Sequence, residues 1–141
     1  MTVPPRERTL RRFHRPALWL VLWAGLFALI ATGSLWPAKE LPSAPIIGLD
    51  KLEHFIGYAL LSAWAVMLFA RMRAQALAVL VVIAFGIALE VAQGALTTDR
   101  SGDSADAMAN ALGALVGLLI SATPLAHALQ RLDAKWFGNP G

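Results

Sequence analysis

The chain has 141 residues, of which 57% are hydrophobic and only 15% are charged, and its mean hydropathy is +0.60. This composition excludes an ordinary soluble domain and places the chain among membrane proteins. The lack of cysteine excludes disulfides, cysteine-based zinc sites and a thiol nucleophile. The net charge of +3 does not indicate a nucleic-acid partner, because the arginines cluster at the N-terminus beside apolar segments, which is typical of membrane topology.

Four apolar segments have about the 20 residues that a transmembrane helix needs. They are residues 17–36, 52–70, 74–96 and 104–123. Pro37 and Pro124 follow the first and the fourth segments, where proline commonly ends a helix. Because the connections are short, neighbouring helices are expected to be antiparallel. The sequence therefore predicts an all-α integral membrane protein, a four-helix up-down bundle in one domain.

The first segment has a second interpretation as a signal peptide, since Ala31 and Gly33 resemble a small-residue cleavage site. Its apolar stretch is longer than the roughly 7–15 residues that form the core of a signal peptide. We therefore favour an uncleaved helix.

The positions of lysine and arginine predict the orientation in the membrane. Nine of the 12 lysine and arginine residues lie before the first segment, between the second and the third, or after the fourth: Arg6, Arg8, Arg11, Arg12, Arg15, Arg71, Arg73, Arg131 and Lys135. The other side holds Lys39, Lys51 and Arg100. Because basic residues favour the cytoplasmic side, both termini are expected there. Residues 1–16 then form a basic cytoplasmic segment, 17–124 the membrane domain and 125–141 a cytoplasmic tail.

The tail has an amphipathic pattern, with one helical face formed by Leu125, Leu129, Leu132 and Trp136. Such a helix can lie at the membrane interface on the inner leaflet. The alternative is a solvated, frayed tail, and the sequence does not decide between the two.

Polar residues share one helical face at the start of the second segment. Lys51, His54 and Tyr58 lie at i, i+3 and i+7. Asp50 precedes His54 by four residues, so we expect it to hydrogen-bond the imidazole. These groups would lie at the outer membrane surface.

The third and fourth segments carry polar faces at the same depth. Glu90 and Gln93 are three residues apart, and Asp106 and Asn110 are four apart. An acid within a membrane span is unfavourable by roughly 2.5–3.5 kcal/mol at mid-span, so Glu90 is unlikely to face lipid. Turning the three faces inward gives an outer polar pocket, in which Lys51 or Arg100 pairs with Glu90, and the helix dipole favours Asp106.

The stripe of Asp106 and Asn110 continues through Gly113 and Gly117, in the pattern GxxxG. This pattern permits close approach of two helices. It predicts either packing inside the bundle or a homodimer face, and the polar residues on the same stripe favour the former.

Three stretches carry a family resemblance: "DKLEHFIGY", "EVAQ" and "RSGDSADAMANALGALVG". In order they supply Asp50, Lys51, His54, Glu90, Gln93, Arg100, Asp103, Asp106, Asn110, Gly113 and Gly117. With this spacing, residues 17–124 resemble the VanZ-like membrane proteins. The resemblance implies a small multipass protein of the bacterial inner membrane. The family is named after a member of a glycopeptide-resistance cluster that lowers susceptibility to teicoplanin, and it brings no established enzymology.

Three functions compete. The first is a non-enzymatic envelope protein whose pocket binds a lipid headgroup, a lipid-linked cell-wall precursor or a lipoglycopeptide, and the surplus of acids favours a cationic or hydroxyl-rich group. The second is an intramembrane enzyme, in which His54, oriented by Asp50, acts as base or joins Glu90, Asp103 and Asp106 in binding a divalent metal. The third is a structural or transport role. Because no recognised catalytic signature is present, we favour binding and expect neither a resident metal nor a cofactor.

Overall fold

The structure is a computed structural model that describes residues 8–36, 48–96 and 103–138. Its elements are α1 (Pro16–Leu35), α2 (Leu49–Leu68), α3 (Met72–Leu96), α4 (Ser104–Leu118), α5 (Ala128–Phe137) and the short 3₁₀ helices η2 (Leu119–Ala122) and η3 (Pro124–His127). Within the described residues the only pairing of β type is an isolated bridge between Leu10 and Phe69. The protein is therefore all-helical, as the sequence predicts.

Among the described residues, three helical segments are long and apolar enough to cross a membrane: α1, α3, and α4 together with η2. The helix α2 has 20 residues, like α1, but is not among them, since Asp50, Lys51 and Glu53 lie in its first two turns. It begins at Leu49, three residues before the predicted start. Gly48 precedes it with φ of 85°, a conformation that glycine adopts without strain.

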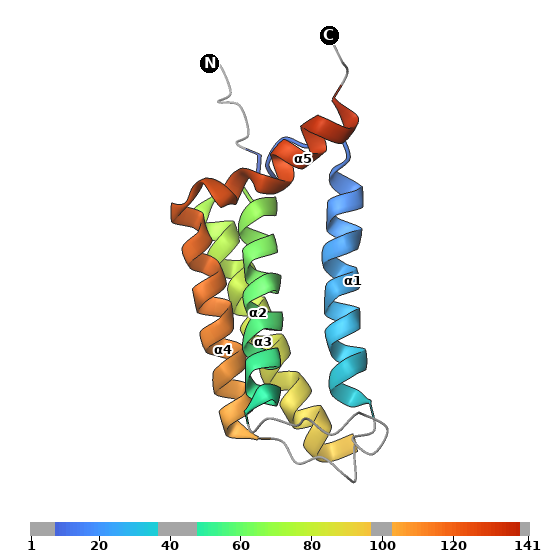
Figure 1. The fold of residues 1–141 in the computed structure, drawn as a ribbon, viewed down its shortest axis with the longest axis vertical. Helices are drawn as coiled ribbons and strands as arrows, with labels where there is room; N and C mark the ends of the chain where they lie inside the picture. The colour runs from blue at the N-terminus through green and yellow to red at the C-terminus, as the bar shows by residue number, and fades with distance from the viewer. Residues whose placement is uncertain (1–7, 37–47, 97–102, 139–141) are drawn as a thin grey trace, which may run out of the picture.

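The helices α1 and α3 run away from the end of the molecule that carries α5, and α2 and α4 run back toward it (Figure 1). We call this the α5 end. The opposite end, where α2 and α4 begin and α3 finishes, is called the polar end. The interior between them is formed by apolar residues of α2, α3 and α4, including Tyr58, Leu61, Val82 and Ala114.

Two glycines of α4 permit its close contact with α2. A Cβ atom at Gly113 would overlap the backbone carbonyl of Phe55, and one at Gly117 would lie 2.7 Å from Cβ of Ser62. Because these distances leave no room for a side chain, the GxxxG stripe faces a neighbouring helix of the same chain.

The helix α1 packs at the side of the molecule, against α2 and α3. Trp19 is its only residue in the buried class. The indole Nε1 of Trp23 donates a hydrogen bond of 3.0 Å to the carbonyl of Leu61 in α2. Most of the surface of α1 is thus exposed, as expected for a helix surrounded by lipid.

The tail forms an ordered helix, α5, across the end of the molecule (Figure 1). Of its predicted apolar face, only Leu129 is buried, whereas Leu125, Leu132 and Trp136 remain exposed. The second buried residue of α5 is Asp133, which lies against the N-terminus of α1. The alternative of a frayed tail is therefore wrong for Ala128–Phe137, which form a helix.

Candidate functional site

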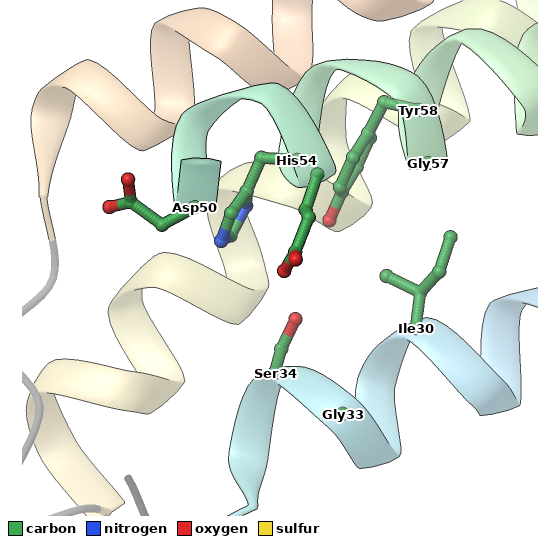
Figure 2. Close-up of a pocket in the computed structure, with 8 residues that line it drawn as sticks. Ile30, Gly33, Ser34, Asp50, His54, Gly57 and Tyr58 are labelled. Atoms are coloured by element: carbon green, nitrogen blue, oxygen red, sulfur yellow. The ribbon is translucent and has the colours of Figure 1, made fainter. Parts of the chain in front are cut away.

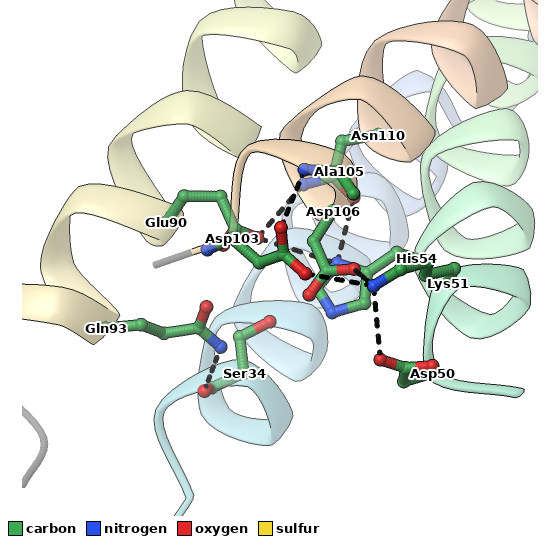
Figure 3. Close-up of polar contacts among 10 residues, drawn as sticks. All are labelled: Ser34, Asp50, Lys51, His54, Glu90, Gln93, Asp103, Ala105, Asp106 and Asn110. Carbon is green, nitrogen blue, oxygen red and sulfur yellow. Dashed lines mark hydrogen bonds and ion pairs between the residues drawn. The ribbon is translucent and has the colours of Figure 1, made fainter. Parts of the chain in front are cut away.

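The polar end gathers side chains from three helices into one group (Figure 3). This polar cluster consists of Asp50, Lys51, His54, Glu90, Asp103, Asp106 and Asn110. It forms because the first turns of α2 and α4 and the last turns of α3 lie at the same end. All seven are among the residues that the sequence singles out. Arg100, which the sequence also assigns to the pocket, lies outside the described residues.

Lys51 is the central cation of the cluster. Its Nζ lies 2.8 Å from Asp106 Oδ1, 3.0 Å from Asp103 Oδ2 and 3.5 Å from Asp50 Oδ2. Asp106 is the least exposed of these three carboxylates, with 15% of its side chain accessible. A single ammonium thus connects the first turn of α2 to the first turn of α4.

Asp103 is the N-cap of α4. Its Oδ1 accepts a hydrogen bond of 2.8 Å from the backbone N–H of Ala105, which otherwise has no partner at the helix start. This hydrogen bond, and then that from Lys51, lower the pKa of Asp103 below its usual value. Asp103 is therefore ionised at neutral pH and also contributes charge to the cluster.

A second chain of contacts joins α2, α4 and α3. The Nδ1 atom of His54 lies 3.0 Å from Asn110 Oδ1, and Asn110 Nδ2 donates a hydrogen bond of 3.4 Å to Glu90 Oε1. The second carboxylate oxygen of Glu90 accepts a hydrogen bond of 3.2 Å from the backbone N–H of Asp103. Glu90 is buried, with 8% of its side chain exposed. The amide of Asn110 thus lies between the imidazole and the buried acid.

These contacts replace two pairings that helical spacing predicts. His54 bonds Asn110 rather than Asp50, which instead pairs with Lys51. Lys51 pairs with the acids of α4 and not with Glu90. Lys51 instead bridges the first turns of α2 and α4, whereas Glu90 accepts hydrogen bonds from Asn110 and from the backbone N–H of Asp103.

Gln93 links the site to α1, because its Nε2 donates a hydrogen bond of 2.7 Å to the backbone carbonyl of Ser34. Ser34 could not be predicted from the sequence, because it takes part through its backbone carbonyl, a group that every residue type has. Nearby, a Cβ atom at Gly86 would lie 2.8 Å from the ring of Tyr58 and 3.1 Å from Cβ of Asn110. Glycine at this position therefore allows α2, α3 and α4 to converge below the cluster.

A cavity of about 330 Å³ lies between α1 and α2 beside the polar cluster (Figure 2). It is lined by Ile30, Gly33, Ser34, Asp50, Glu53, His54, Gly57 and Tyr58. His54 points from α2 toward this space, and Ser34 and Ile30 point toward it from α1, whereas Asp50 points to the side (Figure 2). One part of the wall is acidic and polar, and another is apolar. Such a mixed lining suits a ligand with a polar head and an apolar part.

Three side chains of the cluster have a geometry that permits cation binding. His54, Glu90 and Asp106 each offer one ligand atom, and these atoms all lie within 4.8 Å of one another. Nitrogen and carboxylate ligands of this kind suit several divalent metals. Asp106 is already paired with Lys51 at 2.8 Å, so a metal ion would have to displace or share that ammonium.

In a comparison with known families, the family model described as VanZ/LLP1 matches residues 7–126. This range contains every residue of the polar cluster, and it confirms the resemblance found in the sequence. Comparisons with curated proteins and with solved structures give no match.

Proposed function

We propose that this chain, which belongs to the VanZ/LLP1 family, is a four-span membrane protein that binds an envelope ligand at the polar end. The ligand classes are a lipid headgroup, a lipid-linked cell-wall precursor or a lipoglycopeptide of the teicoplanin type. The protein would lie in the bacterial inner membrane as an up-down bundle of α1–α4, with both termini in the cytoplasm.

The distribution of charge supports this topology. Of the basic residues in the described part of the chain, Lys51 alone belongs to the polar end, and the others lie at or near the α5 end. The positive-inside rule assigns the α5 end to the cytoplasm and the polar end to the outer face. The helix α2 then crosses between α1 and α3, with its three charged residues at the outer interface rather than in the hydrocarbon region.

The cavity between α1 and α2 is the observation that carries the binding function. Its volume of about 330 Å³ is within the range of small-molecule sites, and it combines apolar walls with Asp50, Glu53 and His54. The adjacent cluster holds the buried acid Glu90 and the half-buried acid Asp106, and intramembrane ionisable groups commonly mark functional sites.

Catalysis is the second candidate, and the triad of His54, Glu90 and Asp106 is the observation that favours it. A divalent cation there would polarise a phosphoryl or carbonyl oxygen of an envelope lipid. Without a metal, His54 would act as general base, with Asn110 holding its ring.

The test is purification from native membranes, followed by mass spectrometry for bound lipids and elemental analysis for metal. Wild-type protein should retain a specific envelope lipid, and Glu90→Gln, Asp106→Asn and His54→Ala should each lose it while remaining folded and inserted. Asp133→Asn, which neutralises a buried acid at the opposite end, is the control for lost stability. Retention by all three site variants would contradict the pocket. A stoichiometric metal that disappears in the same variants would favour the catalytic candidate.

A further inference from the structure

The hydrogen bonds of the polar cluster determine which atom of His54 is available to a ligand. The carboxylate of Glu90 can only accept hydrogen bonds, so the amide nitrogen of Asn110 must face it. The amide oxygen of Asn110 therefore faces His54 and requires a proton on Nδ1. In a neutral imidazole the other nitrogen, Nε2, is then an acceptor. In that neutral form His54, whose side chain lines the cavity, has an acceptor and not a donor at Nε2.

Besides the hydroxyl groups of Ser34 and Tyr58, which can donate as well as accept, the cavity is lined by two acceptors that carry negative charge. Asp50 and Glu53 line the same cavity as His54. Among the described residues, five carboxylates stand at this end, from Asp50, Glu53, Glu90, Asp103 and Asp106, and Lys51 is the single ammonium. Acceptors and surplus negative charge favour a ligand that is both cationic and a hydrogen-bond donor, which describes a protonated primary amine.

The remaining wall of the cavity is apolar and open at the side of the molecule. Ile30 and Gly33 come from α1 and Gly57 from α2. Gly33 is exposed, and no atom lies within 4 Å of where its Cβ would be. Cβ at Gly57 would meet only Ile30, at 3.5 Å. Because α1 is a candidate membrane span, its exposed surface at Gly33 would contact the hydrocarbon chains of the bilayer. The cavity would therefore open toward lipid.

We infer that the cavity binds an amphiphile with a primary ammonium headgroup, which enters between α1 and α2 from the bilayer. The ammonium donates to Nε2 of His54 and lies between the carboxylates of Asp50 and Glu53, and the alkyl chain lies along Ile30, Gly33 and Gly57. This inference rests on the proposed function and specifies the chemical class of its ligand.

The experiment compares three probes of equal chain length on purified protein in a neutral detergent. Dodecylamine carries charge and N–H donors, dodecyltrimethylammonium carries charge without donors, and dodecanol carries a hydroxyl without charge. Each is titrated while the thermal unfolding temperature is measured, because a ligand that binds only the folded state raises it. We expect dodecylamine to bind about tenfold or more tightly than either analogue, since hydrogen bonds to charged groups are the stronger ones.

Variants of α1 test the route and the position of the chain. Gly33→Phe adds a ring to the cavity lining at a position where the Cβ itself meets no described atom within 4 Å, and it should abolish the dodecylamine response. Gly25→Phe is the matched control, because Gly25 lies on the same helix, is equally free of neighbours and does not line the cavity. It should respond like wild type. Asp50→Asn combined with Glu53→Gln should make dodecylamine and dodecanol equivalent.

Equal responses of wild type to the three probes, or an unchanged response in Gly33→Phe, would overturn the inference. The proposed function is tested separately, through the native lipid that the protein retains. If that lipid is retained by wild type and lost in Glu90→Gln while dodecylamine has no advantage, the binding function stands and the amine class is wrong. If wild type retains no lipid and responds to no probe, both fail.

Discussion

Trp19 and Asp133, 114 residues apart in the sequence, are joined by a hydrogen bond of 2.8 Å from the indole Nε1 to Oδ1. The same carboxylate accepts hydrogen bonds from the backbone N–H groups of His14 and Arg15 and lies 2.9 Å from Nδ1 of His14. Since Arg15 immediately precedes α1, a side chain of α5 thus binds the two backbone N–H groups that lead into a helix at the other end of the chain. Trp136 of α5 stacks on Trp19, with 6.2 Å between ring centroids.

The first prediction is that Asp133→Ala destabilises the protein strongly. The substitution leaves the indole of Trp19 and two backbone donors without their acceptor, at roughly 1–3 kcal/mol for each donor that remains buried. Thermal unfolding in detergent should therefore occur at a clearly lower temperature than in wild type. Leu132→Ala, on the exposed side of α5, is the control and should have a small effect. Equal effects of the two substitutions would contradict the stabilising role of these hydrogen bonds to Asp133.

A pH dependence follows from the same residue. Burial raises the pKa of Asp133, but hydrogen bonds from the His14 backbone, the Trp19 indole, the His14 ring and the Arg15 backbone together bring it below the usual 3.8. Because the folded-state pKa is lowered, Asp133 contributes its full stability above pH 3.8 and loses it as the pH falls through the lowered value. The difference in unfolding temperature between wild type and Asp133→Asn should be constant at neutral pH and shrink below about pH 4. A difference that grows on acidification would contradict this sign.

The third prediction concerns the contact of α4 with α2. Gly113→Leu and Gly117→Leu should each destabilise by roughly 1–3 kcal/mol or more, because overpacking forces the two backbones apart. Gly25→Leu, where no atom lies within 4 Å of the added Cβ, should be nearly neutral and serves as control. If the GxxxG stripe instead joined two copies of the chain, the leucine variants would change the oligomeric state on size exclusion and leave the unfolding temperature of the monomer unaltered.

Lys51 and Asp106 should be coupled in a double-mutant cycle. Lys51→Met leaves the carboxylates of Asp103 and Asp106 close together without their shared ammonium, so it should destabilise the protein. Adding Asp106→Asn removes one of those charges and should restore part of the lost stability. Additive effects of the two substitutions, measured by thermal unfolding, would show that the 2.8 Å ion pair contributes nothing.

The fifth prediction is the topology. Because the chain has no native cysteine, single cysteines can be labelled without background. Ser101→Cys should react with a membrane-impermeant thiol reagent in intact cells, and Thr2→Cys should react only after the membrane is permeabilised. Labelling of Thr2→Cys in intact cells would reverse the orientation.

Residue spacing is enough to predict the helices and the composition of the polar cluster, but not its internal pairings. A 3.6-residue period places Lys51 and His54 on one face, and this holds whichever helix they meet. Which atoms bond depends on the relative depth and rotation of α2, α3 and α4, which the tight contacts at Gly86, Gly113 and Gly117 determine. Spacing within α2 therefore favoured a local partner for His54, whereas its partner lies 56 residues away.

The role of Asp133 could not be derived from the sequence for a related reason. It was visible only as a lone acid in a basic, amphipathic tail. An acid on a helix facing solvent is common, and nothing local indicates that it is buried against residues more than 100 positions earlier. Ser34 is missed likewise, because its bond to Gln93 uses the backbone carbonyl.

The attachments of α1 have a consequence for biosynthesis. Among the described helices α1 is synthesised first, yet the hydrogen bonds nearest its two ends, Gln93 to Ser34 and Trp19 to Asp133, join it to residues made much later. During translation α1 therefore lacks the hydrogen bonds near both of its ends until α3, and then α5, have been synthesised. The contact of Asp133 with Trp19 is the later of the two to form, so a nascent chain that ends before Asp133 should contain an inserted α1 that a protease can still reach at its N-terminus.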